Sequence, residues 1–323
     1  MTTARSDDLL LRVQSVSYAA EGVIVLEFTD PAGRDLPPWE PGSHLEIVLP
    51  SGLIRHYSLC GPGRGSGTYQ VAVLRVADGR GGSAELHDTG LVGRELTVRR
   101  PRNRFQLAPG APAYVLLAGG IGVTPLLPMA RVLAATGRPF RFVYGARSRN
   151  AFAFAEELRE LAGPRLELID EQAQGRPDLA GIVADAPDGA AIYCCGPEGL
   201  IGAVEAAVEA EHGRVMLHVE RFAATGEIPA VQAGDFAFEL VLRHSGKTIT
   251  VPADRTALEL VHELIPGHPY SCLEGECGSC EVAVLEGKVE HRDQVLSDAE
   301  RAANTSMMLC VSRARSARLV IDL

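Results

Sequence analysis

The chain has 323 residues, of which 46% are hydrophobic and 22% charged, and its formal net charge is −10 at pH 7. This length predicts two or three domains, and the acidic balance argues against a nucleic-acid partner while it permits a protein partner with a basic face. The N-terminus lacks the apolar core of a secretory signal, and prolines interrupt the longest apolar run, residues 111–135. We therefore expect a cytoplasmic protein that does not enter a membrane and is monomeric on its own.

The first third of the chain predicts a small antiparallel β-barrel. Short runs with strand character recur at regular spacing, and glycines and prolines separate them. One short helix is expected near residues 83–89. The expected strands cover residues 11–16, 22–28, 44–49, 55–59, 69–76 and 95–98.

A motif of the form R-x-Y-S lies on the expected strand 55–59. Strand alternation places Arg55 and Tyr57 on one face and His56 and Ser58 on the other. The planar fork of an arginine suits a phosphate, and tyrosine and serine hydroxyls can bond a polar ring edge or a sugar chain. Taken alone, the motif is equally compatible with a strand that carries a surface arginine.

A second motif, Arg80-Gly81-Gly82-Ser83, precedes the expected short helix. Paired glycines allow backbone amides to approach an anion, and Ser83 could both cap the helix and bind that anion. An ordinary hairpin turn is the alternative interpretation.

The middle third begins with the apolar run 113–118, which predicts a strand buried on both faces. The segment that follows is Gly119-Gly120-Ile121-Gly122-Val123-Thr124-Pro125. We expect Thr124 to cap a helix whose first residue is Pro125, with a pyrophosphate bound by free amides at its N-terminus. The spacing is not G-x-G-x-x-G, so a plain strand–turn–helix junction remains an alternative.

Strands and helices then alternate, which predicts a mostly parallel sheet. The expected strands are 140–145, 165–170, 190–195 and 215–222, the last at an edge, and the expected helices are 152–161 and 198–211. Ligands of such sheets bind beyond the carboxyl ends of the strands. The glycine-rich segment, the residues around Arg147 and the turn Cys195-Gly196-Pro197 all fall at this edge.

The residues leave the choice of dinucleotide open. Arg147 and Arg149 could accept a ribose phosphate, which favours NADPH. Asp170 and Glu171 would repel that phosphate and suit free ribose hydroxyls, which favours NADH.

The last third contains the most specific signal of the sequence. Cys272, Cys277 and Cys280 have the spacing C-x4-C-x2-C, and Cys310 follows after a long gap on an expected strand 307–311. This arrangement is typical of a plant-type [2Fe–2S] cluster, and the glycines between the cysteines allow the loop to curl around it. Zinc would need a second cysteine pair or histidines, and a disulfide framework is unusual in a long chain without a signal peptide. A hairpin at 236–251 and a capped helix from Thr256 precede the loop.

The order of these motifs resembles the phthalate dioxygenase reductase family, the flavin and iron–sulfur reductases of Rieske oxygenase systems. The resemblance covers essentially the whole chain. It implies a multidomain protein with an antiparallel β-barrel FMN domain at 1–108 and an α/β parallel-sheet NAD domain at 109–225. A linker at 226–236 and an α+β, β-grasp ferredoxin domain at 237–323 complete the expected organisation.

The resemblance also implies roles for single residues. Arg55, Gly81, Gly82 and Ser83 would hold the flavin phosphate, and Tyr57 and Ser58 would line the isoalloxazine and ribityl chain. The Cys195-Gly196-Pro197 turn would lie beside nicotinamide and flavin, with Phe222 against the flavin ring, although Cys195 could be a merely buried thiol and Phe222 a structural aromatic. We name Ser58, Cys195 and Phe222 as the candidates nearest the chemistry. The further candidates for cofactor binding are His56, Arg80, Gly119, Gly120, Gly122, Thr124, Pro125, Arg147, Asp170, Gly196 and Pro197.

Three cofactor sites in one chain predict an electron relay. NADH delivers two electrons as hydride and a [2Fe–2S] cluster accepts one, so a flavin must stand between them. We expect an NADH-dependent reductase that passes electrons through FMN and the cluster to a Rieske-type oxygenase. A reductase for a cytochrome P450 or a diiron hydroxylase, and a non-catalytic redox sensor, are the alternatives.

Overall fold

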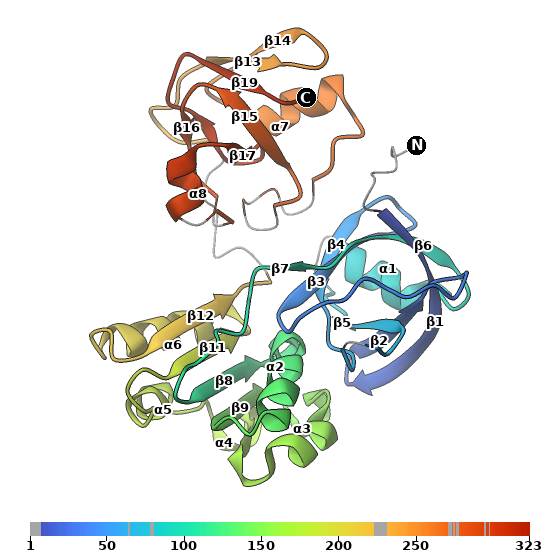
Figure 1. Cartoon of the computed structure of the whole chain (residues 1–323), viewed down its shortest axis with the longest axis vertical. Helices are drawn as coiled ribbons and strands as arrows, with labels where there is room; N and C mark the ends of the chain where they lie inside the picture. The colour runs from blue at the N-terminus through green and yellow to red at the C-terminus, as the bar shows by residue number, and fades with distance from the viewer. Residues whose placement is uncertain are drawn as a thin grey trace. The chain divides into compact units, whose positions relative to one another are not determined.

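The structure is a computed structural model that describes residues 8–63, 65–77, 81–222, 231–270, 273, 275, 278–293, 295–296 and 298–323. These residues form two compact units, one ending at Phe222 and the other made by the C-terminal part of the chain. The first unit contains an antiparallel sheet and a parallel sheet (Figure 1). In the part of the chain described, no helix has the length and apolar character that a membrane crossing requires.

The antiparallel sheet has the strand order β4-β3-β6-β1-β2-β5, with β7 paired to β3. An additional bridge between Leu59 and Val71 joins the two ends of this order, which closes the sheet as the predicted barrel requires. Its interior is filled by alternate strand residues such as Leu11, Phe28 and Ile47. The elements are β1 (Asp8–Ala20), β2 (Val23–Thr29), β3 (Ser43–Val48), β4 (Ile54–Ser58), β5 (Thr68–Leu74), α1 (Gly82–Asp88), β6 (Glu95–Arg99) and β7 (Arg102–Asn103).

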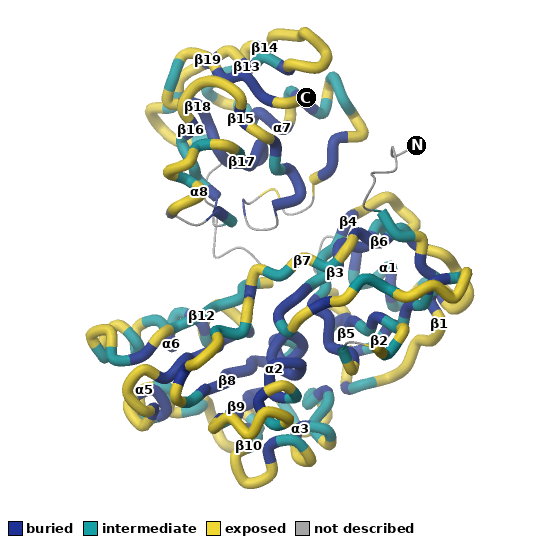
Figure 2. Tube along the Cα trace, in the orientation of Figure 1, coloured by how far each residue is buried: buried dark blue, intermediate teal, exposed yellow. Residues whose placement is uncertain are grey.

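The parallel sheet has the order β10-β9-β8-β11-β12, which confirms the predicted α/β domain with the last strand at an edge. Every residue of β8 and β11 is buried, because helices cover both faces (Figure 2). Helices α2 and α3 pack on one face, and α5 and α6 pack on the other. The strands are β8 (Tyr114–Gly119), β9 (Phe140–Ala146), β10 (Leu166–Asp170), β11 (Ala191–Cys195) and β12 (Met216–Glu220). The α-helices are α2 (Val123–Ala135), α3 (Ala155–Ala162), α4 (Glu171–Gln174), α5 (Leu179–Ala184) and α6 (Glu198–Glu209).

The barrel and the parallel sheet share one hydrophobic core. Ala20, Val23, Cys60 and Ala72 of the barrel belong to the same buried cluster as the residues of α2 and α3. The connecting chain is also tied down, since the hydroxyl of Tyr193 donates to the Gln106 carbonyl at 2.9 Å and accepts from the Ala108 amide at 2.6 Å. The two sheets are therefore packed as one body rather than joined by a loose hinge.

The C-terminal unit is a mixed sheet of order β14-β13-β19-β15-β17 with a small second sheet of β16 and β18, as expected for a ferredoxin domain. Only the β13–β19 pair is parallel among the described strands of these two sheets. Helix α7 packs its apolar face on the sheet and begins with the predicted cap at Thr256. The elements are β13 (Phe238–Leu242), β14 (Lys247–Val251), α7 (Ala257–Leu264), β15 (Glu281–Glu286), β16 (Val289–Glu290), α8 (Asp298–Ala303), β17 (Ser306–Met308), β18 (Arg313–Ala314) and β19 (Arg318–Ile321).

Two predicted helix caps are wrong. A 3-10 turn at Gly120–Gly122 leads directly into α2, so its N-cap is Gly122, and Thr124 and Pro125 lie inside the helix. The Thr124 hydroxyl donates back to the Ile121 carbonyl at 2.9 Å. Helix α1 is capped by Gly81 in the left-handed region, and the Ser83 hydroxyl instead accepts from the Val76 amide at 3.1 Å.

Three other boundaries also differ from the prediction. Helix α3 begins at Ala155 rather than at residue 152, because Phe154 has a φ of 59° and breaks the helical path. Helix α6 ends at Glu209 rather than at residue 211. Cys310 lies in a turn after β17, where the Val311 and Ser312 amides both donate to the Met308 carbonyl, and not on a strand.

Candidate functional site

Arg55 lies against Gly82, which brings the R-x-Y-S strand and the second glycine motif together. A Cβ atom on Gly82 would be 2.4 Å from the Arg55 Nε, so the Arg55 side chain lies directly on the glycine backbone. Arg80 lies outside the described residues. The cradle of one arginine and glycine backbone fits an anionic group such as a flavin phosphate.

The rest of the R-x-Y-S motif divides between the two faces of β4, as predicted. Tyr57 packs against the barrel core, and burial raises the pKa of its phenol to about 12. His56 lies on the other face with Ser58, and its ring is 5.3 Å from the ring of His44. Tyr57 is therefore a neutral hydroxyl at physiological pH.

Ser58 reaches across from the barrel to the edge strand of the parallel sheet. Its hydroxyl donates to Oε2 of Glu220 at 3.2 Å. Burial raises the pKa of Glu220 to about 8, although the Ser58 bond acts in the opposite direction. Glu220 pairs with Cys195 in the sheet, and burial together with the nearby Glu220 carboxyl raises the pKa of the Cys195 thiol well above its usual range. The three side chains form a group without net charge at neutral pH.

Sequence reasoning missed Glu220. It stands in a strand with mixed polarity, and no motif marks it. Its partner Ser58 is 162 residues away, so only the packed fold shows the contact. A buried carboxyl whose pKa is strongly raised is a candidate functional residue, and Glu220 also bonds a serine of the R-x-Y-S motif.

Three glycines hold the two expected nucleotide-binding turns together. A Cβ atom on Gly122 would be 2.1 Å from the Cys195 carbonyl oxygen, and one on Gly119 would be 2.7 Å from a Pro197 side-chain carbon. A Cβ atom on Gly196 would be 2.9 Å from the Gly119 Cα. Gly120 has a φ of 53° and is the first residue of the 3-10 turn that connects Gly119 to Gly122. The start of α2 and the Cys195 turn therefore form one continuous backbone surface, which suits a pyrophosphate and its ribose.

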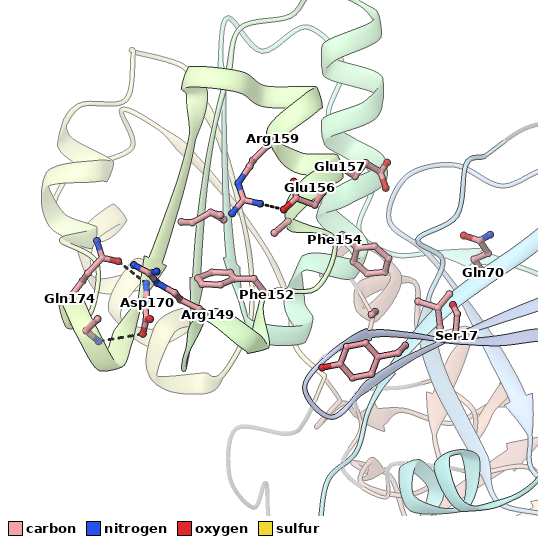
Figure 3. A pocket seen from close by; sticks show the side chains of 16 residues that line it. Ser17, Gln70, Arg149, Phe152, Phe154, Glu156, Glu157, Arg159, Asp170 and Gln174 are labelled. Carbon is pink, nitrogen blue, oxygen red and sulfur yellow. Dashed lines mark hydrogen bonds and ion pairs between the residues drawn. The ribbon is translucent and has the colours of Figure 1, made fainter.

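Arg147 and Asp170, the residues expected near the adenosine ribose of the dinucleotide, follow and end the strands β9 and β10 respectively. Ala146 and Asp170 are paired at the carboxyl ends of β9 and β10, so Arg147 and Asp170 share one edge. Asp170 accepts from the Ala173 amide at 3.3 Å as the cap of α4, and Arg147 is exposed. A pocket of about 930 Å³ opens here, with Phe152, Arg149 and Asp170 on one side (Figure 3). Ser17 and Gln70 of the barrel line it as well, and its lining does not include Gly122 or Cys195.

Phe222 lies two residues beyond β12 and is 46% exposed. It is the last described residue of the first unit. An exposed aromatic at this position is compatible with packing against a bound planar group, so its contact with flavin stays a prediction.

The C-terminal unit brings two of the four expected cluster ligands together. β15 pairs with β17 in a register that matches Glu281 with Met308, so Cys280 and Cys310 lie at the same end of the ladder. Both are 2% exposed, and the Leu309 amide donates to the Cys280 carbonyl at 3.3 Å. Cys272 and Cys277 lie outside the described residues.

The loop that carries the other ligands uses glycine as predicted. Gly275 and Gly278 have φ values of 75° and 72°. A Cβ atom on Gly275 would be 2.6 Å from a Val311 methyl and 3.0 Å from the Asp293 Cα, so Gly275 lies directly on these two residues. Two buried cysteines beside a glycine-dependent loop fit an iron–sulfur cluster.

Comparisons with known proteins find related domains and relatives along the chain. A family model described as "2Fe-2S iron-sulfur cluster binding domain" matches residues 241–315. A second, "Dimethylamine monooxygenase subunit DmmA-like, N-terminal domain", matches residues 95–214. Phenoxybenzoate dioxygenase subunit beta of Ectopseudomonas oleovorans is 42% identical over 97% of both chains.

Two solved structures share the complete fold. Phthalate dioxygenase reductase, described as a modular structure for electron transfer from pyridine nucleotides to [2Fe-2S], has a TM-score of 0.70 and 37% identity over 98% of both chains. An intact type IV self-sufficient cytochrome P450 monooxygenase has a TM-score of 0.88 and 38% identity, over 98% of this chain and 41% of that one. This chain thus spans about two fifths of the length of that monooxygenase.

The barrel, the nucleotide-binding sheet and the [2Fe–2S] domain define a flavin and iron–sulfur oxidoreductase of the kind that serves an oxygenase. The similarity to such reductases extends over almost the whole length. The chain belongs to the phthalate dioxygenase reductase family.

Proposed function

We propose that this reductase takes hydride from NADH, holds the electrons on FMN and passes them singly through its [2Fe–2S] cluster to a Rieske-type oxygenase. The observation that carries the proposal is the convergence of Ser58, Glu220 and Cys195 next to the Gly119–Gly122 turn, within a chain that also carries a ferredoxin domain. The segments that we assign to these functions are 1–108 for FMN, 109–225 for NADH, 226–236 as linker and 237–323 for the cluster.

The flavin chemistry is the transfer of two electrons in and one electron at a time out, which the cofactor supplies when bound. Arg55, Arg80, Gly81, Gly82 and Ser83 would hold the FMN phosphate. Tyr57 and His56 would line the ring and its side chain, with Phe222 over the ring. These residues bind and orient and need not exchange protons with a substrate.

Ser58, Glu220 and Cys195 set the charge where hydride arrives. A hydride carries negative charge, so an ionised carboxylate beside its path would oppose the transfer. Because burial raises its pKa to about 8, Glu220 is mostly protonated at neutral pH, and the thiol of Cys195 is also neutral. The group positions the nicotinamide without that repulsion.

NADH is favoured over NADPH by Asp170, whose carboxylate lies at the edge expected for the adenosine ribose. Arg147 at the same edge argues in the other direction. The test compares kcat/KM for the two donors in the wild type and in Asp170→Ala. We expect NADH to be preferred and the variant to lose much of that preference, whereas a wild type that prefers NADPH would reverse the assignment.

The flavin itself is identified by heating the purified protein and analysing the released cofactor. FMN is the expected result. FAD would show that the phosphate cradle at Arg55 continues into a nucleotide site.

A cytochrome P450 is a second candidate acceptor, because the fold of this chain occurs within a self-sufficient P450 monooxygenase. Reduction rates measured with a purified Rieske oxygenase and with a P450 separate the two. Faster reduction of the P450 would favour this second acceptor.

A further inference from the structure

The side chain of Arg131, on α2 of the nucleotide domain, forms hydrogen bonds with the barrel. Its Nη1 donates to the Cys60 carbonyl at 2.7 Å and also to the Gly61 carbonyl. Its Nε and Nη2 donate to the two carboxylate oxygens of Glu157 on α3, at 2.5 and 3.0 Å. One guanidinium therefore joins two helices of the nucleotide domain to one segment of the barrel.

The two carbonyls lie just beyond the end of β4, two and three residues after Ser58. The Cys60 amide donates to the Gln70 carbonyl at 2.9 Å, which fixes this segment to β5. A Cβ atom on Gly61 would be 3.0 Å from the Gln70 Cβ, so the segment is already packed tightly against that strand. The carbonyls held by Arg131 are thus rigidly connected to Ser58.

The other end of α2 is fixed to the nucleotide-binding turns through the close packing of Gly122 on the Cys195 carbonyl. Arg131 lies eight residues after Val123, the first residue of the helix, which is about 12 Å along its axis. The helix is continuous from Val123 to Ala135, with Pro128 inside it between the two contacts. Its N-terminus carries the proposed pyrophosphate site, and its middle carries the contact to the flavin strand.

We propose that Arg131 is a positioning residue for hydride transfer, because it sets the spacing between the nucleotide-binding turns and the flavin-binding strand. This inference rests on the proposed function. The step is the transfer of one proton with two electrons from the nicotinamide ring to the flavin, which yields NAD⁺ and reduced flavin. Since this transfer needs donor and acceptor in close contact, a small loss of alignment lowers its rate more than it weakens NADH binding.

The shared core and the bond from the Glu21 amide to the Asn150 carbonyl also hold the barrel against the nucleotide domain. Loss of Arg131 is therefore expected to loosen the junction and leave the unit folded. Arg131→Gln removes the guanidinium and its charge, whereas Arg131→Lys keeps the charge but loses the planar group that donates in several directions. Glu157→Gln leaves Arg131 in place and removes only the charge of the carboxylate that accepts from it. Arg141→Gln is the matched control, since Arg141 pairs with Glu167 on the exposed surface of the same domain.

The experiment is anaerobic stopped-flow reduction of the holoenzyme by NADH. In Arg131→Gln we expect the limiting rate of flavin reduction to fall at least tenfold, with the dissociation constant for NADH changed less than twofold. The primary isotope effect with deuterated NADH should rise, and Arg131→Lys and Glu157→Gln should show smaller rate losses. Hydrogen exchange without NADH should become faster in peptides that cover residues 58–71, and Arg141→Gln should match the wild type throughout.

A wild-type limiting rate in Arg131→Gln, or equal losses in rate and in NADH affinity, would overturn the inference. If Arg131→Gln does not fold, the rates of flavin reduction in Arg131→Lys and Glu157→Gln test the inference, and wild-type rates in both would overturn it.

The test of the proposed function is separate from the test of Arg131. A wild type whose flavin is not reduced by NADH contradicts that function whatever the variants do.

Discussion

At the residue scale, three glycines allow the close contact between the start of α2 and the Cys195 turn, where we propose that the nucleotide binds. Gly119, Gly122 and Gly196 all face backbone or proline atoms at distances that no side chain tolerates. These three positions therefore need glycine because no Cβ atom fits there. Gly120 is the one glycine of the 119–122 segment with a left-handed backbone conformation.

Gly122→Ala is expected to weaken NADH binding at least tenfold, which corresponds to about 1.4 kcal/mol. The added methyl would be 2.1 Å from the Cys195 carbonyl, so α2 has to move away from the turn. NADH saturation of flavin reduction measures the effect. Gly202→Ala on α6 is the control, because its Cβ would have its nearest neighbour at 4.0 Å. Equal NADH affinity in both variants would show that the contact is unimportant.

The raised pKa of Glu220 predicts that the free energy of unfolding depends on pH. The pKa of its carboxyl is about 8 in the folded protein and 4.5 in a model compound, so the folded state favours the protonated form. Its contribution is fully present below pH 4.5 and is lost as the pH rises towards 8. Between pH 6 and pH 9 the wild type should therefore lose more stability than Glu220→Gln.

Urea unfolding followed by the fluorescence of Trp39, the only tryptophan, tests this prediction. Trp39 is buried in the barrel of the same unit. Parallel pH profiles for the wild type and Glu220→Gln would mean that the carboxyl is already ionised in the folded protein.

Among the residues of the site, the sequence revealed those that belong to local motifs. R-x-Y-S, the paired glycines and the cysteine spacing are short patterns whose chemistry can be recognised without a fold. Glu220 and Arg131 could not be found in this way, because the contact that singles out each one is with a residue distant in the chain, Ser58 and Cys60 respectively.

At the element scale, the strands were predicted better than the helix ends. Continuous apolar runs such as 113–118 and 190–195 identify buried parallel strands, since both faces are covered by helices. Helix caps depend on the conformation of single residues. The 3-10 turn at Gly120–Gly122 displaced the expected cap at Thr124, and the positive φ of Phe154 delayed α3.

The segment that contacts Gly275 has a buried carboxylate at its centre, Asp293. Asp293 accepts from the Val295 and Leu296 amides at 3.2 and 2.9 Å and from the Ser312 hydroxyl at 3.2 Å. Gly275 of the cluster loop packs on its Cα. Asp293 therefore connects the support of the loop to the turn after β17.

Asp293→Ala should release the cluster faster, because it leaves buried donors unpaired at a cost of about 1–3 kcal/mol each. The measurement is the decay of the cluster absorbance in aerobic buffer with a chelator, where we expect a severalfold higher rate. Asp322→Ala is the control, as Asp322 makes an exposed pair with His244 in the same domain. Identical decay in the two variants would place the support of the loop elsewhere.

At the scale of the whole molecule, the chain combines a unit with the flavin-reductase fold and a [2Fe–2S] unit. The first unit is stiff, since barrel and parallel sheet share a core, and stiffness suits a reaction that needs close alignment of two rings. The second unit carries the cluster domain in a separate compact body. The division matches the two kinds of electron transfer that a flavin connects.

Anaerobic titration with NADH tests the relay most directly, with flavin and cluster absorbance followed together and iron and acid-labile sulfide determined on the same sample. In the wild type we predict that both chromophores are bleached. In Cys310→Ser and Cys272→Ser, flavin bleaching should persist without any cluster signal. A wild type that contains no iron, or one in which NADH bleaches the flavin and leaves an intact cluster oxidised, would contradict the account.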